Sequence, residues 1–414
     1  MKFAIYTLGC KTNQYESEVM RESFLKEGFS EVDFKDISDV YVINSCVVTE
    51  KAERETRKAV NDALRKNPSA KVVLTGCYTK LHDEFKDRRV IIYNGHRNAL
   101  GSFLRDGKEN IDTSPEKIES FLERTRAFVK IEEGCNNFCT YCIVPFVRGF
   151  EITSKAKDLV VSEVKSLVES GFKEVVLTGT EIGKYGVDIA TNLPELINEL
   201  KRIDGLERLR ISSIHPKYVT DALINEFEDP YALEPHLHIS LQSGDNEILK
   251  RMNRGYTREE YLGIVQKLRK INPNFAVSTD MIVGFPFETE DAFLNSLSII
   301  REVDFSKVHV FRYSKRPFTP AFYFEESVPE SVKSVRSERM REFASAIALE
   351  YKKRFLNHTV EVLVEENVLG VSYGFTPNYL RVSFKGEVPI NSIAKVKITS
   401  VNADIMEGEL ICLK

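Results

Sequence analysis

Three cysteines lie within one short segment of the chain, Cys135-Asn-Asn-Phe-Cys139-Thr-Tyr-Cys142. Cysteine thiolates are the usual ligands of a [4Fe–4S] cluster, which most often has four of them. Three cysteines at this spacing leave the fourth iron without a protein ligand, so that a small molecule can bind the metal there. The segment therefore predicts a [4Fe–4S] cluster with one open coordination position.

Two other roles for these cysteines fit the sequence less well. A zinc site needs a fourth ligand to complete its tetrahedron, and the nearest histidines, His96 and His215, lie far away in the sequence. A disulfide with one free thiol suits a secreted protein, whereas this chain shows no secretory signal and has an odd number of cysteines, 7.

The composition is that of a globular protein with no membrane partner. The 414 residues are 42% hydrophobic and 29% charged, and no apolar run approaches the length of a membrane span. We therefore expect a cytoplasmic protein. The net charge of −4 gives no support for a nucleic-acid partner. Any RNA contact must therefore use local basic clusters, such as Lys250–Arg258 or the run through Arg312, Lys315 and Arg316.

The first segment, residues 1–115, alternates strand-like and helical patterns. The apolar strand-like runs are Phe3–Leu8, Val40–Ile43, Val72–Leu74 and Val90–Tyr93. Charged helical stretches such as Glu50–Lys66 fall between them. This alternation predicts a Rossmann-like open parallel sheet.

A second group of cysteines follows the strands of this sheet. Cys10, Cys46 and Cys77 each come directly after one strand-like run. Because the carboxyl ends of parallel strands meet at one edge of a sheet, we expect the three thiols to converge. Buried structural cysteines are the alternative, although that role suits positions inside strands better than positions at their ends. The pattern favours a second three-cysteine cluster.

The second segment, residues 121–352, follows a polar linker at Asp106–Thr125. Its strand-like runs are Ala127–Ile131, Glu174–Thr178, Arg208–Ser212, His236–Leu241, Phe275–Ile282 and Lys307–Phe311. Six βα units are too few for an eight-stranded barrel, so they predict a partial (β/α)6 barrel. Its site should lie at the carboxyl ends of the strands, and the loop of Cys135 follows the first of them.

Small and polar residues follow the later strands and suggest a cofactor pocket. The candidates for cofactor binding are Tyr141, Gly179, Glu181, Ser212, Ser213, Gln242 and Asp280. A carboxylate there can pair with an ammonium group, and glycine allows a close backbone approach. We expect His215 and Lys250–Arg254 to lie at the rim of the pocket as surface residues.

The third segment, residues 353–414, has alternating strand patterns separated by Gly, Pro and Asn turns. About 60 residues of this kind predict a small OB-like β-barrel. Such barrels often bind RNA through aromatic and basic side chains, for which Phe375, Tyr379 and Arg381 are candidates. Acidic residues slightly outnumber basic ones in the segment, which weakens that interpretation.

Motifs from all three segments resemble the radical-SAM methylthiotransferase family, whose members use S-adenosylmethionine (SAM). They are Thr7-Leu-Gly-Cys10-Lys-Thr-Asn13-Gln14-Tyr15-Glu16-Ser-Glu18, Asn44-Ser-Cys46, Thr75-Gly-Cys77, Glu133-Gly-Cys135, Tyr141-Cys142-Ile-Val-Pro145, Leu241-Gln-Ser-Gly244, Val283-Gly-Phe-Pro286 and Phe311-Arg-Tyr-Ser314. The third segment is similar to that family's TRAM domain. Within the family, the opening motif and the turn at Leu177–Gly183 are similar to the subgroup that acts on N6-threonylcarbamoyladenosine beside the tRNA anticodon.

The resemblance implies a reaction with two [4Fe–4S] clusters and two molecules of SAM. Cys135, Cys139 and Cys142 would hold the cluster that cleaves SAM to a 5′-deoxyadenosyl radical. Cys10, Cys46 and Cys77 would hold an auxiliary cluster that carries the sulfur. One SAM would methylate that sulfur, and the radical from the second would remove hydrogen from C2 of the base. The implied partners are the tRNA anticodon stem-loop, an electron donor and a sulfur donor, and the sequence identifies neither donor.

The substrate is less well defined than the chemistry. Phe287 and Phe318 stand where the family usually has glycine, and His215 replaces a common glutamate. A carboxylate on the modified base is best bound by arginine, for which Arg312 and Arg316 are candidates. Isopentenyladenosine in tRNA and a ribosomal-protein aspartate are alternative substrates. An iron–sulfur RNA-binding regulator without catalysis is the alternative of a different class.

Overall fold

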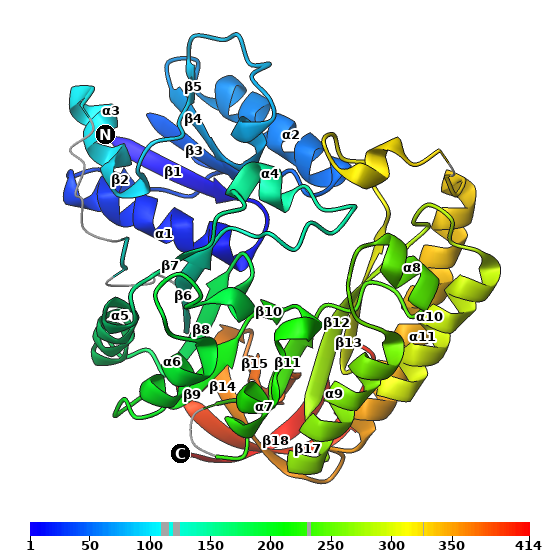
Figure 1. Cartoon of the computed structure of the whole chain (residues 1–414). Helices are drawn as coiled ribbons and strands as arrows, with labels where there is room; N and C mark the ends of the chain where they lie inside the picture. The colour runs from blue at the N-terminus through cyan, green and yellow to red at the C-terminus, as the bar shows by residue number, and fades with distance from the viewer. Residues whose placement is uncertain (109–115, 119–124, 230–232, 326) are drawn as a thin grey trace.

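The computed structural model describes residues 1–108, 116–118, 125–229, 233–325 and 327–414. Most of the expected linker Asp106–Thr125, with the domain boundaries at 115 and 121, lies outside these residues. Figure 1 shows the N-terminal domain at the top, the core below it and the C-terminal barrel at the bottom. None of the helices in the described part of the chain is both long and apolar enough to cross a membrane.

The N-terminal domain is the expected open parallel sheet. Its strands are β1 (Lys2–Thr7), β2 (Ser30–Glu31), β3 (Val40–Ser45), β4 (Lys71–Gly76) and β5 (Val90–Ile92), in the spatial order β2-β1-β3-β4-β5. The helices are α1 (Lys11–Lys26), α2 (Glu50–Lys66) and α3 (Leu100–Asp106), and the 3-10 turns are η1 (Cys77–Lys80) and η2 (Arg97–Ala99). The edge strand β2 was not predicted, because its two residues are both exposed and carry no apolar pattern.

Helices cover both faces of this sheet. All six residues of β3 are buried, since alternate side chains enter two different cores. Val40 and Val42 pack in a cluster with Phe24 of α1. Tyr41 and Ile43 pack in a cluster with Val60 of α2. A continuous apolar run is the sequence pattern of such a strand.

The core domain is the expected partial barrel. Its strands are β6 (Arg126–Glu133), β7 (Thr153–Ser154), β8 (Glu174–Gly179), β9 (Arg208–Ile211), β10 (Ser213–Ile214), β11 (His236–Ile239), β12 (Ala276–Val283) and β13 (Lys307–Arg312). They form two sheets with the orders β7-β6-β8-β9 and β10-β11-β12-β13, and the pairs β6–β8, β8–β9, β10–β11, β11–β12 and β12–β13 are parallel. The expected third strand, Arg208–Ser212, ends at Ile211, and the two residues after Ser212 form β10, which pairs with β11.

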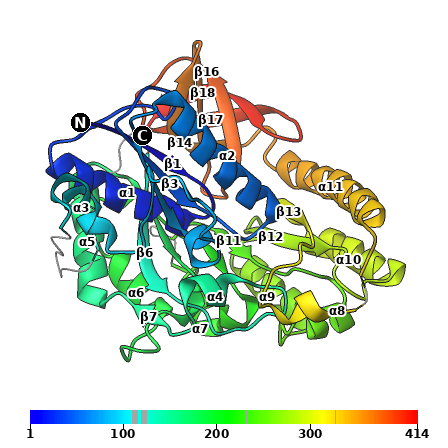
Figure 2. The same cartoon turned by 90° about the horizontal axis from the view of Figure 1, so that it is seen from above.

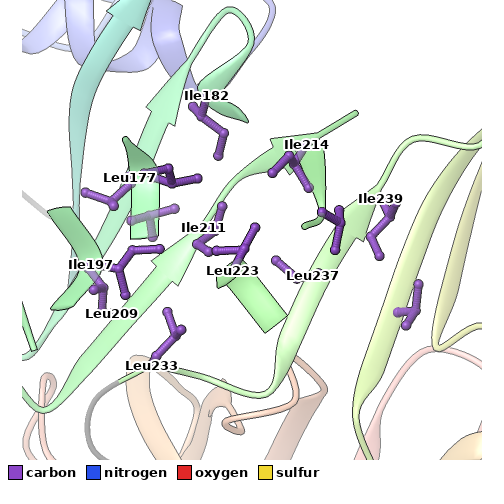
Figure 3. Packing of buried hydrophobic residues seen from close by; sticks show 14 of the residues in the cluster. Leu177, Ile182, Ile197, Leu209, Ile211, Ile214, Leu223, Leu233, Leu237 and Ile239 are labelled. Atoms are coloured by element: carbon purple, nitrogen blue, oxygen red, sulfur yellow. The ribbon is translucent and has the colours of Figure 1, made fainter. Parts of the chain in front are cut away.

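Helices cover the outside of these strands, except the first helix of the core, which packs against the N-terminal domain. The helices are α4 (Val144–Arg148), α5 (Lys157–Glu169), α6 (Leu193–Leu200), α7 (Asp221–Asn225), α8 (Asn246–Arg251), α9 (Arg258–Ile271), α10 (Glu290–Val303) and α11 (Glu330–Lys353), with the turns η3 (Ile182–Lys184), η4 (Pro216–Tyr218) and η5 (Pro320–Tyr323). Figure 3 shows the apolar side chains of the core, including Leu177, Ile211 and Leu237, meeting between the strands. This packing makes the strands a rigid frame for the loops at their carboxyl ends.

The C-terminal segment is the expected closed β-barrel. Its strands are β14 (Thr359–Val368), β15 (Val371–Phe375), β16 (Arg381–Lys385), β17 (Ile393–Val401) and β18 (Met406–Leu413), in the order β14-β15-β16-β18-β17. Viewed from above, β16, β17 and β18 gather to one side of the core, near α11 (Figure 2). The seventh cysteine, Cys412, is exposed in β18.

The two outer domains contact opposite ends of the core strands. Thr12 of the N-terminal domain donates a hydrogen bond to the carbonyl of Gly179, the last residue of β8, at 3.2 Å. At the other end, Arg208 and Arg210, at the start of β9, donate to barrel carbonyls of Phe375 and Pro377 at 2.9 and 2.7 Å. The N-terminal domain therefore covers the strand ends that carry the cysteine loop.

Candidate active site at the strand ends of the core

The loop of the first three cysteines is held in place by backbone hydrogen bonds. Cys135 N–H donates to the carbonyl of Gly149 at 3.0 Å, and Thr140 N–H donates to that of Met252 at 3.0 Å. Gly134, just before the loop, has φ +99°, and a side chain there would collide with the carbonyl of Glu151. The loop therefore follows β6 in one defined path, with its thiols toward the core.

The thiols of this loop lie beside a buried cation. Burial raises the pKa of Cys135 to about 11 and that of Cys142 to about 12. The guanidinium of Arg254, only 4% exposed, donates to Cys139 Sγ at 3.2 Å. Buried thiols next to a buried guanidinium suit thiolate ligands of an iron–sulfur cluster, because the metal displaces the protons and the cation offsets the negative charge.

The cysteines are not arranged to share one metal ion. Among the residues that the structure describes, no three His, Cys, Asp or Glu side chains form a group that could hold a single ion. A cluster differs from such a site, since each cysteine binds a different iron.

A cavity of about 320 Å³ opens beside this loop. Five of the residues that the sequence assigns to cofactor binding line it, namely Tyr141, Glu181, Ser213, Gln242 and Asp280. Gly179 ends β8 and Ser212 lies between β9 and β10, and neither lines the cavity. The strand-end pattern thus brings most of its candidates together in one place.

Two residues expected at the rim are instead buried in the wall of this cavity. His215 is 3% exposed and Arg254 is 4% exposed, and both line the cavity. The expectation that they are surface residues was wrong. A polar residue in a loop is usually solvated, and only the folding of that loop over the strands shows that these two point inward.

The carboxylates of the cavity differ in their surroundings. Burial raises the pKa of Glu181 to about 7, although the N–H of His215 donates to its Oε1 at 3.2 Å. Burial acts in the same direction on Asp280, but a contact of 3.3 Å with His238 Nε2 outweighs it and leaves the pKa lowered. The cavity therefore offers one carboxylate that titrates near neutral pH and one that stays ionised.

The second group of three cysteines follows strands of the N-terminal sheet at the edge that faces the core. Cys10 follows β1, Cys46 follows β3 and Cys77 begins the turn η1 after β4. The residues before two of them, Gly9 and Gly76, have φ +101° and +88°, values that favour glycine. Parallel strands with sharp glycine turns at their ends therefore direct the thiols to one place.

A buried arginine of the core reaches this second group. Arg148, the last residue of α4, donates from Nε to Cys77 Sγ at 3.2 Å and from Nη2 to Asn13 Oδ1 at 2.5 Å. It also forms an ion pair with Glu133 at 2.9 Å and a closer one with Glu16. Burial raises the pKa of Cys77 to about 11. Each cysteine group thus has a buried guanidinium in contact with one sulfur.

The two cysteine groups lie on either side of one interdomain seam. Val48 and Thr49, which follow Cys46, line the cavity of the first group. Helix α4 continues from the first cysteine loop, and its Val147 packs in one cluster with Cys77. A further cavity of about 430 Å³ lies on the Cys77 side of α4. A ligand at the seam can therefore approach both groups.

The expected substrate residues have different positions. Arg312 is exposed and lines the first cavity. Arg316 is only 4% exposed, because it pairs with Glu53 at 2.8 Å and donates to the carbonyl of Val47. Its guanidinium therefore joins the domains and is not a cation at the cavity mouth.

The barrel candidates lie at the far end of the core from the cysteines. The ring of Tyr379 is 5.0 Å from that of His236 and 4.8 Å from the guanidinium of Arg210, both at strand beginnings. Tyr379 therefore contributes to domain docking. Arg381 is exposed, with Glu366 as its ion-pair partner at 3.7 Å.

The fold and the three-cysteine loop together define a radical-SAM enzyme. Residues 129–300 match the model of the radical SAM superfamily, whose domain uses SAM and a [4Fe–4S] cluster, and residues 2–91 match that of the uncharacterized protein family UPF0004. A solved structure of the radical SAM methyltransferase TsrM from Kitasatospora setae, with cobalamin and a [4Fe–4S] cluster bound, superposes with a TM-score of 0.57 at 14% identity. It covers 90% of this chain and 80% of that one, and shows the fold alone.

Similar sequences then define the family. A threonylcarbamoyladenosine tRNA methylthiotransferase MtaB of Thermotoga maritima is 38% identical, over 98% of this chain and 98% of the relative. The protein of the same name from Bacillus subtilis is 38% identical over 99% and 96%. A tRNA-2-methylthio-N(6)-dimethylallyladenosine synthase of Clostridium novyi is 37% identical over 99% and 96%. The chain belongs to the radical-SAM methylthiotransferase family, which excludes the regulator without catalysis.

Proposed function

We propose that this enzyme adds a methylthio group to C2 of N6-threonylcarbamoyladenosine in tRNA, beside the anticodon. The single observation that supports it best is the placement of two cysteine groups at one seam, since sulfur transfer and radical chemistry need separate metal sites near one substrate. The names of the relatives from Thermotoga maritima and Bacillus subtilis favour this base. Because its substrate is tRNA, we expect the enzyme to act in the cytoplasm.

A dimethylallyl-modified base is the second candidate. It is favoured by the relative from Clostridium novyi, whose identity of 37% differs little from the 38% of the others. The two bases differ in charge, because the threonyl group carries a carboxylate and the dimethylallyl group does not. A cationic side chain at the mouth of the cavity would therefore favour the threonylcarbamoyl base over the dimethylallyl base.

Each cysteine group has one role in this proposal. Cys135, Cys139 and Cys142 hold the [4Fe–4S] cluster that supplies the electron for SAM cleavage. Cys10, Cys46 and Cys77 hold an auxiliary [4Fe–4S] cluster that supplies the sulfur. Arg254 and Arg148 donate hydrogen bonds to one sulfur of each group, and these cations offset the charge of the bound clusters. The electron donor and the sulfur donor are separate partners.

The cavity residues position SAM next to the first cluster. We assign Glu181 to the ammonium group of SAM, because its carboxylate lies in the cavity among the cysteines of the loop. Ser213, Gln242 and Asp280 are the polar groups for the ribose and adenine. Gly179 and Ser212 shape the backbone beneath them, and Tyr141 forms part of the wall.

SAM affinity should depend on pH through Glu181. Its pKa, raised to about 7 by burial, means that the carboxylate gains a proton and loses its charge below neutral pH. The ammonium of SAM then loses its partner, so the affinity should fall about tenfold between about pH 8 and about pH 6. Equilibrium binding of SAM across this range measures the effect. Glu181→Gln should bind weakly with a flat profile, and a flat profile for the unchanged enzyme would exclude this role.

The enzyme should act on threonylcarbamoylated tRNA and ignore unmodified adenosine. The threonyl carboxylate is best bound by a guanidinium, and Arg312 is the exposed arginine that lines the cavity. Arg312→Met keeps much of the side-chain volume but removes the charge. It should lower turnover of the modified tRNA by about 10- to 100-fold, the usual value of a charged hydrogen bond.

Three tRNA substrates compared in one assay test this assignment. They carry threonylcarbamoyladenosine, dimethylallyladenosine or unmodified adenosine at the same position. Arg381→Met is the matched control, because Arg381 is also exposed but lies on the barrel. It should leave the ratio between substrates unchanged. Preference of the unchanged enzyme for the dimethylallyl base would assign the second candidate function.

A further inference from the structure

Two exposed phenylalanines form a pair at the interdomain seam. Phe146 of α4 is 42% exposed and Phe318, after β13, is 58% exposed. Their ring centroids are 6.1 Å apart, with an angle of 33° between the planes. Phenylalanines are mostly buried in folded proteins, so an exposed pair next to a reaction site suggests a surface for a planar ligand.

The backbone at Phe318 is unfavourable for a large side chain. Phe318 has φ +67°, in the left-handed region where glycine is preferred. This explains why the family usually has glycine here. The chain holds an aromatic ring in this position despite the strain, and strained residues concentrate at functional sites.

Phe287 provides an internal comparison for Phe318. It also replaces a usual glycine, and its φ is +70°. Its ring is half-buried and packs within the protein, since the guanidinium of Arg251 lies 4.1 Å from its centroid and the Phe324 ring lies 5.8 Å away. The two phenylalanines thus share the strained backbone, but Phe318 presents its ring to solvent.

The Phe146–Phe318 pair lies next to both cysteine groups. Phe146 lines the cavity on the Cys77 side of α4, together with Lys80. Ser314, four residues before Phe318 in the chain, lines the cavity of the first cysteine group. A ligand on these two rings is therefore close to the place where the target base must enter.

Two exposed cations belong to the surroundings of this pair. Lys80 lines the same cavity as Phe146, and Lys315 lies three residues before Phe318 in the chain. The combination of exposed rings and separate cations matches unpaired RNA, whose bases stack on aromatic side chains while phosphates contact basic ones. Because the proposed substrate is tRNA, an unpaired RNA base is the planar ligand that we expect at this surface.

We propose that the Phe146–Phe318 pair stacks an unpaired base of the RNA loop that carries the target adenosine. This inference rests on the proposed function, since it deepens how that site binds tRNA. The pair would hold a neighbouring base of the loop while the target base enters the seam. Lys80 and Lys315 contact phosphates of the same loop.

The probe is an anticodon stem-loop RNA with 5-iodouridine at one unpaired loop position at a time. Stacked iodouridine crosslinks to aromatic side chains on irradiation, and peptide mass spectrometry locates the crosslink. We expect crosslinks to Phe146 or Phe318 at one loop position. We also expect the dissociation constant of the stem-loop to rise about tenfold in Phe318→Gly, within the usual value of a stacked base.

The variants distinguish stacking from a general effect on folding. Phe318→Gly relieves the backbone strain, so its melting temperature should equal or exceed that of the unchanged enzyme. Phe146→Leu keeps an apolar side chain but removes the ring, and should weaken binding to a similar extent. Phe287→Gly relieves the same kind of strain elsewhere and should leave RNA affinity unchanged.

The outcomes separate this inference from the proposed function. If the unchanged enzyme binds the stem-loop but neither Phe318→Gly nor Phe146→Leu weakens binding, the inference is wrong and the proposed function stands. Absence of a crosslink to both rings likewise overturns it. If the unchanged enzyme binds the stem-loop no better than duplex RNA of equal length, the proposed function itself is wrong.

Discussion

Replacing Cys139 with alanine is expected to reduce formation of 5′-deoxyadenosine from SAM to the background rate. Cys139 is 7% exposed, and its sulfur contacts the guanidinium of Arg254 at 3.2 Å. Its loss leaves two cysteines for a cluster that needs at least three, because the open iron has no protein ligand. Without that cluster no electron reaches SAM, so the loss should be complete.

Chromatographic assay of 5′-deoxyadenosine with a chemical reductant measures this effect without tRNA. Cys412→Ala is the matched control, because Cys412 is exposed on the barrel and lies outside both cysteine groups. It should retain full activity and full iron content. Retention of 5′-deoxyadenosine formation by Cys139→Ala would show that this loop does not hold the SAM-cleaving cluster.

Replacing Cys10, Cys46 and Cys77 together with alanine should separate the two halves of the reaction. Two [4Fe–4S] clusters give about eight irons per chain after anaerobic reconstitution, and this variant should hold about four. The first cysteine loop remains intact, so SAM cleavage should persist. Methylthiolated base should be absent, because the sulfur has no site from which to be transferred.

Iron and sulfide analysis, SAM cleavage and nucleoside analysis of tRNA are measured on the same preparation. The variant also removes the sulfur that Arg148 contacts and leaves that cation with Glu16 and Glu133 as partners. Circular dichroism therefore accompanies the assays to show that the domain still folds. Full iron content in the variant would contradict a second cluster, and continued methylthiolation would contradict its role in sulfur transfer.

The cysteine groups and the fold class could be predicted because they follow from local pattern. Cys135, Cys139 and Cys142 are close in the chain, so their spacing alone brings them together. Cys10, Cys46 and Cys77 are far apart in the chain, but each ends a strand of a parallel sheet. The topology of such a sheet places strand ends at one edge. The same rule brought Glu181 into the cavity, whereas Asp280 lies inside β12.

The partners of long polar side chains were not predictable in this way. Arg316 was expected at the mouth of the cavity and is instead buried against Glu53 of α2. Arg148 and Arg254 were not expected at the sulfurs they contact. The local sequence does not show whether an arginine side chain is solvated or paired with a buried carboxylate. Its long side chain can reach either environment.

The amino-acid sequence by itself determined the order of the domains, the two cysteine groups and the strand ends that form the cavity. These features follow from hydrophobic periodicity and from glycine turns, both of which are properties of short segments of the chain. Only the tertiary structure decided that Tyr379 docks the barrel onto the core, that Arg316 joins two domains, and that Phe146 meets Phe318. Each of these contacts joins residues far apart in the chain, and their geometry depends on how whole domains pack.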